Sequence, residues 1–482
     1  MTMHSRLRLP RCAVALLLTT ALLHADPAAL EKKIWALLDQ DKLYSSLPGA
    51  DFLALGAGFD LPDGGKTVTD LTLAAPGGAL DFRVLEKIPA KTLGYEAKWC
   101  VERFKHYNLD WDITGLRLTS LDPEAKKYPW LVIMNGGAAN VYEFFVDLKS
   151  RPGWGQFLAQ KLNVFIVSIP GNFKYGGWTQ PIKDESRQPA YLLDRDLSPD
   201  ENNVRHAIYT NRMVMHGLEQ LVMKHTTGDI FMIGHSTSGE LAFLSYEYPA
   251  LAERLKGRFL GWGSGGPARA RGLQAAKEPG TRDTEGGMSA MKALEVLNRR
   301  DAKGYSRGYS GWLNPLYEPG MSHMQIAEKW LEAEKVRRPN FKQPLQDMEH
   351  SSGAWGKKGE LERQIEALLA KSGNPWGVDL DEVSRDLFST AFTRMDGFNQ
   401  IVWCVGHYDR NHWLPEDPMN AWEVFLAKEF RLKNPSAKVR ILVWDVPMTH
   451  YGHVEKPKEL AAGFYSVVRW FNYNPATVAA TN

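Results

Sequence analysis

Cysteine is scarce in this sequence, since the 482 residues include only three. Cys12 begins an apolar N-terminal stretch, so only Cys100 and Cys404 remain for the rest of the chain. A single pair in so long a chain excludes a fold that depends on a disulfide framework. Because Cys404 lies within the apolar run Ile401–Val405, we expect a buried free thiol there rather than a disulfide.

A dominant charge is also missing, because 58 Lys and Arg nearly balance 56 Asp and Glu, which gives a net charge of +2. Proteins that bind nucleic acid carry a basic excess or a basic patch, so nucleic acid is not expected as the main partner. Beyond the N-terminus the chain has no uninterrupted apolar run of about 18 residues, and we therefore expect no transmembrane segment. Hydrophobic residues make up 44% and charged residues 24% of the chain, which is typical of soluble globular proteins.

Residues 1–25 predict a cleavable signal peptide. A basic region with three Arg comes first, an apolar stretch from Cys12 to Leu23 follows, and Ala25 offers a small residue for cleavage. The apolar stretch is too short to span a bilayer. Removal of residues 1–25 takes away three Arg and no acid, which changes the net charge of the chain from +2 to −1. We expect a secreted or periplasmic protein; the alternative is a short buried N-terminal helix.

The rest of the chain changes its pattern near residue 128. Before this point, residues 28–39 have the apolar spacing of a helix, and three stretches resemble strands, namely Thr67–Leu73, Asp81–Leu85 and Ile113–Leu121. After it, helical segments such as 204–224 alternate with short apolar strands. These strands are Trp130–Met134, Val164–Ile169, Asp229–Ile233, Phe259–Trp262, Ile401–Val405 and Val439–Trp444. The alternation predicts an α/β fold with a mostly parallel sheet flanked by helices on both faces.

A helix-rich, polar segment separates the last two of these strands from the others. We call residues 267–398 the cap segment; it divides the α/β core into residues 26–266, which include an N-terminal extension, and residues 399–482. Helices are expected at 322–337, 361–369 and 379–388. Ligands of open α/β sheets bind at the carboxyl ends of the strands, so the segment is best interpreted as a helical cap over these ends. A surface excursion without a role is the alternative.

The sharpest motif is Gly234-His235-Ser236-Thr237-Ser238-Gly239, directly after an expected strand and before an expected helix. A serine on such a strand-to-helix turn is held in a strained conformation that lifts its Oγ above the sheet. The residues two before and two after must be small to avoid collision, and Gly234 and Ser238 both qualify. Ser236 is therefore the expected nucleophile.

A serine hydroxyl needs a base that takes its proton, and the base should follow the acid in chain order. His450 and His453 compete for this role in the loop after Val439–Trp444, and His450 is favoured because it lies closer to the strand end. The expected acid is Asp409, which follows Ile401–Val405 across a short turn and would orient the imidazole. It has two rivals. Asp396 precedes its strand, and Asp445 lies near the end of one.

The oxyanion of a tetrahedral intermediate needs two backbone donors. Thr237 N–H is the expected first donor. The second should come from the glycine-rich loop after Trp130–Met134, with Gly137 as first choice and Ala138 as second. The histidines near the acid and the base lack the spacing of a helical zinc motif, so no metal and no cofactor are expected.

Taken in order, Asn-Gly-Gly, Gly-His-Ser-x-small-Gly, Gly-x-x-Asp and His-Tyr-Gly-His with Glu-Lys-Pro resemble the α/β-hydrolase superfamily. The resemblance covers roughly residues 128–266 and 399–475, and it leaves the subfamily open. It departs from the common pattern at Asn135, where many members carry His, and at Ser238, where most carry Gly. The resemblance implies an α/β-hydrolase fold, and its likeness in the tail supports His450 as the base.

The expected activity is hydrolysis of a carboxylic ester through an acyl-enzyme on a Ser-His-Asp triad. The same triad also serves amide or lactone hydrolysis, acyl transfer and carbon–carbon cleavage, and a hydrolase fold used only for binding is a further alternative. The substrate would be a small-molecule ester. Tryptophans in and near the expected cap either serve packing or form a wall for a bulky or aromatic group; they are Trp178, Trp312, Trp330, Trp355 and Trp376. The oligomeric state is left open.

Overall fold

The computed structural model describes part of the chain. The described residues are 26–74, 82–134, 141–145, 151–168, 198, 200–201, 204–205, 208, 211–236, 238–264, 282–283, 287–288, 366–380, 382, 397–407, 409, 413, 418, 421–446, 448 and 452–473. The expected signal peptide and most of the cap segment lie outside them. Within the part that is described, none of the helices has the length and hydropathy to cross a membrane.

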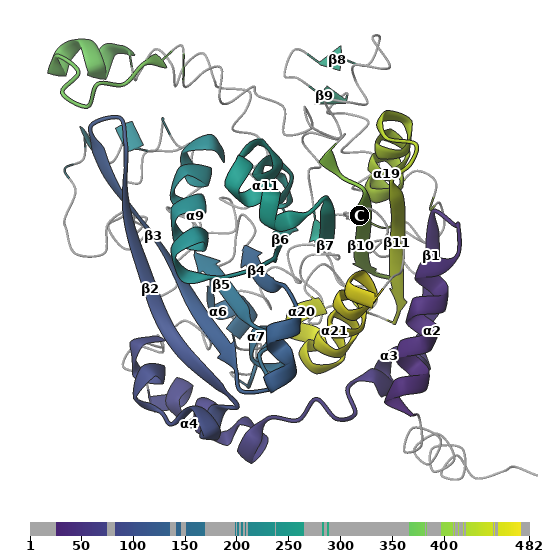
Figure 1. Cartoon of the computed structure of the whole chain (residues 1–482). Helices are drawn as coiled ribbons and strands as arrows, with labels where there is room; N and C mark the ends of the chain where they lie inside the picture. Colours follow the sequence, from purple (N-terminus) through teal and green to yellow (C-terminus); the bar gives the residue numbers. More distant parts are fainter. Residues whose placement is uncertain are drawn as a thin grey trace, which may run out of the picture.

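A nine-stranded sheet forms the centre of the molecule (Figure 1). Its order is β1-β11-β10-β7-β6-β4-β5-β3-β2. The neighbours pair in parallel except for β2 with β3 and β3 with β5. The strands are β1 (Tyr44–Pro48), β2 (Tyr95–His106), β3 (Leu109–Ser120), β4 (Trp130–Met134), β5 (Val164–Ser168), β6 (Ile230–Ser236), β7 (Arg258–Ser264), β10 (Gln400–Gly406) and β11 (Lys438–Asp445). This confirms the mostly parallel sheet and each of the six strands expected after residue 128.

Helices cover both faces of the sheet, as expected for strands that are apolar on both sides. In β4, Leu131 and Ile133 belong to one buried cluster, and Val132 and Met134 belong to the other. The first cluster includes side chains of α2 (Pro27–Asp39), α3 (Gly49–Leu55), α6 (Val141–Phe145), α7 (Trp154–Leu158) and α21 (Pro457–Tyr473). The second includes those of α9 (Asn211–His225), α10 (Gly239–Leu244), α11 (Pro249–Leu255) and α19 (Trp422–Lys433).

Shorter elements complete the described fold. They are α4 (Lys66–Ala74), α5 (Ala90–Leu93), α20 (Gly452–Glu455), the 3-10 helices η1 (Pro62–Gly65), η3 (Phe82–Lys87), η4 (Pro123–Lys127) and η7 (Ser245–Glu247), and the two-stranded antiparallel pair β8 (Arg282–Asp283) and β9 (Gly287–Met288).

Two of the strands expected in the N-terminal extension are wrong. Thr67–Leu73 lies within α4, because the Asp63 carboxylate accepts hydrogen bonds from the Thr67 N–H at 3.2 Å and from its hydroxyl, and so caps a first turn. The stretch Asp81–Leu85 falls largely in η3, where Phe82 and Leu85 share one buried side three residues apart; Asp81 itself is not described. The β-branched residues of Thr67–Leu73 suggested a strand, but the local hydrogen bonds to Asp63 stabilise a helix there.

The N-terminal extension also supplies an edge strand. β1 pairs in parallel with β11 along the whole length of β1, at the opposite end of the sheet from β2. The helix before it is attached to α21, since Arg469 Nη1 lies 2.9 Å from Glu31 Oε2 and Trp35 Nε1 donates to the Ser466 carbonyl at 2.9 Å. Residues 26–48 therefore belong to the α/β core.

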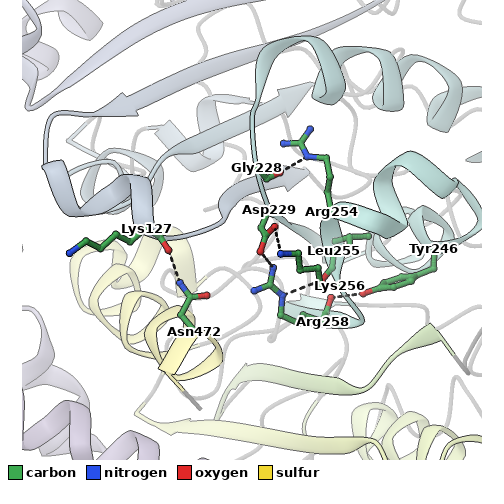
Figure 2. A network of polar contacts seen from close by, with 9 residues as sticks. All are labelled: Lys127, Gly228, Asp229, Tyr246, Arg254, Leu255, Lys256, Arg258 and Asn472. Carbon is green, nitrogen blue, oxygen red and sulfur yellow. Dashed lines mark hydrogen bonds and ion pairs between the residues drawn. The ribbon is translucent and has the colours of Figure 1, made fainter. Parts of the chain in front are cut away.

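The amino ends of β6 and β7 are held together by a polar network (Figure 2). Asp229 accepts from Arg258 at 3.0 Å and lies 2.9 Å from Lys256 Nζ. Tyr246 in turn donates to the Arg258 carbonyl at 2.9 Å. Burial lowers the pKa of Arg258, although Asp229 opposes this shift. The network lies at the edge of the sheet opposite to the carboxyl ends of the parallel strands.

A small part of the cap segment lies against the tip of the β2–β3 hairpin. Residues 366–372 are helical and stop before Gly373, as expected. The Asn108 N–H donates to the Trp376 carbonyl at 2.9 Å, and Tyr107 Oη donates to the Asp379 carbonyl at 3.3 Å. Leu369 is buried in the cluster that contains α9. The other helices expected in the cap segment lie outside the described residues, apart from positions 379, 380 and 382.

The two cysteines outside the N-terminal stretch are free and buried, as expected for Cys404. Burial raises the pKa of the Cys100 thiol to about 11, and it raises that of Cys404 as well. Both thiols therefore stay protonated and unreactive near neutral pH.

Candidate active site

Ser236 is the last residue of β6, and a tight turn connects it to α10. The Ser238 N–H donates back to the His235 carbonyl at 3.2 Å, and the Leu241 N–H donates to the Ser238 carbonyl at 3.0 Å. The pairing of β6 with β7 shifts register between His235 and Ser236. The strand, turn and helix expected around Ser236 are confirmed. The Ser236 side chain and all of Thr237 lie outside what the structure describes.

The turn explains why position 234 needs a glycine. A Cβ placed on Gly234 would lie 2.1 Å from the Ser238 carbonyl oxygen, 2.4 Å from its carbon and 2.5 Å from the Gly239 nitrogen. All three atoms are main chain, so no side chain can move aside. The chain therefore folds back on itself around residue 236, as a nucleophile elbow requires.

Ser238 stands where most α/β-hydrolases carry glycine, and its side chain makes hydrogen bonds within the elbow. Its side chain is buried, and its Oγ lies 2.9 Å from the Met134 carbonyl and 2.8 Å from the His235 carbonyl. The single hydroxyl proton is shared between these acceptors. The hydroxyl thereby joins the elbow to the end of β4. The expected oxyanion donor Gly137 and its rival Ala138 follow β4, but both lie outside the described residues.

The sheet topology brings the expected site residues to one edge. Five neighbouring strands of the sheet, in the order β4, β6, β7, β10 and β11, all run in parallel. Their carboxyl ends lead to the segments that contain Gly137, Ser236, Asp409 and His450. The expected nucleophile, acid and base, Ser236, Asp409 and His450, also follow each other in this chain order. The fold is that of the α/β-hydrolases.

Asp409 is fully buried three residues past β10. Its N–H donates to the Gly406 carbonyl at 3.0 Å, and its carbonyl accepts from the Trp413 N–H at 2.6 Å. The N–H and the carbonyl of Asp409 are thus both hydrogen-bonded within a turn. The rival Asp445 ends β11 with a side chain that is 49% exposed and that lies 2.9 Å from His407 Nδ1. The other rival, Asp396, is not described.

His407 connects the ends of two strands. Its N–H donates to the Trp444 carbonyl at 3.1 Å, in addition to the contact between its ring and Asp445. The turn that carries Asp409 is therefore attached to the end of β11, which leads to His450. His450 itself lies outside the described residues.

His453 is fully buried in α20. Its Nδ1 accepts a hydrogen bond from Trp262 Nε1 at 3.1 Å. Its ring meets that of His235 edge-on at a centroid distance of 4.6 Å, and the Phe144 ring lies 4.8 Å away. A structural hydrogen bond was the alternative to catalysis for His453, and the structure shows one. Sequence reasoning missed Trp262 as the partner, although a buried indole N–H usually finds an acceptor.

Comparison with known proteins shows likeness only at the level of solved structures. No protein-family model matches the chain, and no curated protein sequence matches it. The chain is similar to a membrane phospholipase A described as a bacterial virulence factor, with 14% identity over 78% of this chain and 87% of that chain and a TM-score of 0.34.

Two further solved structures have the same degree of likeness. One is a probable hydrolytic enzyme from Pseudomonas aeruginosa, with 13% identity over 78% of this chain and 95% of that chain and a TM-score of 0.38. The other is a putative epoxide hydrolase from Klebsiella pneumoniae, with 10% identity over 77% and 97% and a TM-score of 0.39. All three likenesses are weak, so the assignment of the fold depends on the sheet topology and the elbow.

Proposed function

We propose that this protein is a serine hydrolase that cleaves a carboxylic ester through an acyl-enzyme, with Ser236 as nucleophile. The observation that carries the proposal is the elbow after β6, where the Gly234 backbone leaves no room for a Cβ beside Ser238. Such a turn raises the Oγ of its central serine above the sheet and directs the next backbone N–H toward the same point.

The proposed reaction has two halves. His450 takes the proton of Ser236 as its Oγ attacks the carbonyl carbon, and the backbone N–H groups of Thr237 and Gly137 stabilise the oxyanion. The tetrahedral intermediate then expels the alcohol, which receives the proton from His450. In the second half, a water molecule deprotonated by His450 attacks the acyl-enzyme. The acid is released as Ser236 Oγ leaves and takes the proton back from His450, which regenerates the free enzyme.

Burial supports Asp409 as the residue that orients the base. Its carboxylate lies in the interior, where a negative charge stabilises a nearby imidazolium more strongly than it would in water. Asp445 is half exposed and already contacts His407, so it is the weaker candidate.

The hydrogen bond from Trp262 supports His450 over His453 as the base. An indole N–H can only donate, so Nδ1 of His453 must be an acceptor and its proton must lie on Nε2. A triad base has the opposite tautomer, with Nδ1–H donated to the acid. Protonation of His453 at Nδ1 would also place its N–H opposite the N–H of Trp262, so that two donors would face each other. His453 is therefore unsuited to exchange protons in a catalytic cycle.

The cap segment is proposed to shape the substrate pocket. Trp376 packs against the buried cluster around α9, and its carbonyl accepts from Asn108, which favours packing for this one tryptophan. Trp178, Trp312, Trp330 and Trp355 lie outside the described residues and stay candidates for an aromatic wall. Cleavage at residue 25 and secretion or export to the periplasm also stay proposals.

Turnover of esters by matched variants tests the proposal. Ser236→Ala and His450→Ala should abolish ester hydrolysis, and Asp409→Asn should lower kcat by about 10⁴-fold because it favours the wrong tautomer. Asp445→Asn is the control, since it alters the rival carboxylate at an exposed position, and it should retain nearly full activity. The acyl group would be offered as ester, lactone and amide to separate these reactions. A folded Ser236→Ala protein with wild-type turnover would refute the proposal.

A further inference from the structure

The segment that carries His450 is held at both ends. Met448 is fully buried, and its N–H donates to the Val446 carbonyl at 2.6 Å. At the other end, a Cβ placed on Gly452 would lie 2.5 Å from Met448 Cγ and 2.8 Å from Trp262 Cζ2. The two ends thus lie side by side, with Gly452 next to the indole ring of Trp262, and only three residues, with His450 in the middle, connect them.

The far end of this segment is also attached to the elbow. His453 follows Gly452 directly, and it accepts the hydrogen bond from Trp262 in β7. Trp262 is the residue of β7 that pairs with His235, the neighbour of Ser236. The His453 ring meets the His235 ring at 4.6 Å as well. One imidazole therefore contacts both the strand of the nucleophile and the strand beside it.

We infer that Trp262 and His453 form a positioning pair that sets the place of His450 relative to Ser236. The inference rests on the proposed function and adds two residues that act through the base without contact with substrate. A span of three residues has a limited reach, so a shift of its anchor moves the imidazole with it. Displacement of a catalytic group by about 1 Å can lower a rate by about 10²-fold.

The chemistry of the pair suits this role. Trp262 is fully buried, so its N–H needs an acceptor, and an aliphatic side chain at position 453 would leave that donor unsatisfied. Because the pair excludes a proton on Nδ1 of His453, the anchor keeps one hydrogen-bonding arrangement while His450 gains and loses its proton. The segment therefore has one imidazole for proton transfer and one for attachment.

Three variants of the pair test the inference. His453→Leu removes the acceptor, and Trp262→Phe removes the donor. His453→Asn restores an acceptor, because its Oδ1 takes nearly the place of Nδ1. Using the best ester, we expect the Leu and Phe variants to lose about tenfold to a hundredfold in kcat with little change in KM. The Asn variant should retain most of the wild-type kcat, and the double variant Trp262→Phe/His453→Leu should lose little more than either single one.

Trp403→Phe is the matched control. Trp403 is also fully buried in a central strand, but its indole N–H has no hydrogen-bond partner among the described residues. The control should lower the melting temperature through lost packing and leave kcat unchanged. A fall in kcat equal to that of Trp262→Phe would mean that any core tryptophan has this effect, and it would overturn the inference.

The outcomes for the inference and for the proposed function differ. If the wild-type protein neither hydrolyses esters nor reacts with a fluorophosphonate at Ser236, the proposed function fails before any variant is made. If the wild type is active, wild-type kcat in a folded Trp262→Phe protein or in a folded His453→Leu protein overturns the positioning role, because each variant removes the hydrogen bond between the two side chains. Should His453→Leu not fold, full kcat in Trp262→Phe alone overturns it, because that variant removes the same hydrogen bond.

Discussion

Replacement of Gly234 by alanine is the sharpest perturbation of the elbow. The added Cβ would lie 2.1 Å from the Ser238 carbonyl oxygen, with two further main-chain atoms within 2.5 Å. Ordinary contacts between nonbonded heavy atoms lie near 3.5 Å, so the turn must move by about 1 Å to accept the methyl group. The backbone that moves contains Ser236 and its neighbour Thr237, which are the proposed nucleophile and oxyanion donor.

Two effects of different size should follow from Gly234→Ala. Overpacking of a closed turn lowers the free energy of unfolding by about 1–3 kcal/mol, which a protein of this size can tolerate. Displacement of the nucleophile by about 1 Å lowers kcat by about 10²-fold. We therefore expect a folded protein with a modest loss of stability and a large loss of ester turnover.

The assay combines urea unfolding with kcat for an acetate ester, and Gly56→Ala is the control. Gly56 has a helical φ of −62°, and a Cβ there would approach only the flexible side chains of Lys458 and Glu459, at 3.4 Å and 3.3 Å. This control should change neither stability nor kcat substantially. Wild-type kcat and stability in Gly234→Ala would refute the account of the elbow, because they would mean that the turn has room for a side chain.

Three further predictions concern other contacts. Ser238→Ala removes the hydroxyl that lies 2.9 Å from the Met134 carbonyl and should lower the free energy of unfolding by about 1 kcal/mol in urea titrations; unchanged stability would contradict it. Arg258→Met breaks the contact with Asp229 at the opposite edge of the sheet, so it should lower the melting temperature while ester kcat stays at the wild-type value. Burial and a neighbouring histidine lower the pKa of His106 from 6.5 to about 4, so the unfolded chain takes up this proton first and stability falls as the pH decreases from 6.5 toward 4. His106→Gln should flatten this decline in melting temperature, and an identical decline in both proteins would count against the shift.

The parallel strands and the elbow could be predicted because their signals are local. A fully buried strand such as Trp130–Met134 is apolar at every position, and the motif around Ser236 combines small neighbours with a strand before it and a helix after it. The same reasoning placed Asp409 after β10, where the structure shows it buried. These features need no knowledge of distant parts of the chain.

The features that could not be predicted depend on distant partners. The short strand Tyr44–Pro48 has little apolar alternation, and its pairing with β11 joins residues about 400 positions apart in the sequence. The assignment of His453 to a structural role likewise depends on Trp262, which lies 191 positions away. Within α4, the alternation of Thr and Val suggested a strand, and only the cap from Asp63 shows why a helix forms.

The most direct test of the central claim is identification of the residue that a fluorophosphonate labels. The probe reacts with a serine that a neighbouring base has activated, and mass spectrometry of the digested protein locates the adduct. The account predicts a single adduct on Ser236 in the native protein, and no adduct in His450→Ala under the same conditions. A native protein that hydrolyses esters but carries the label on another residue, or that labels equally well without His450, would contradict the account.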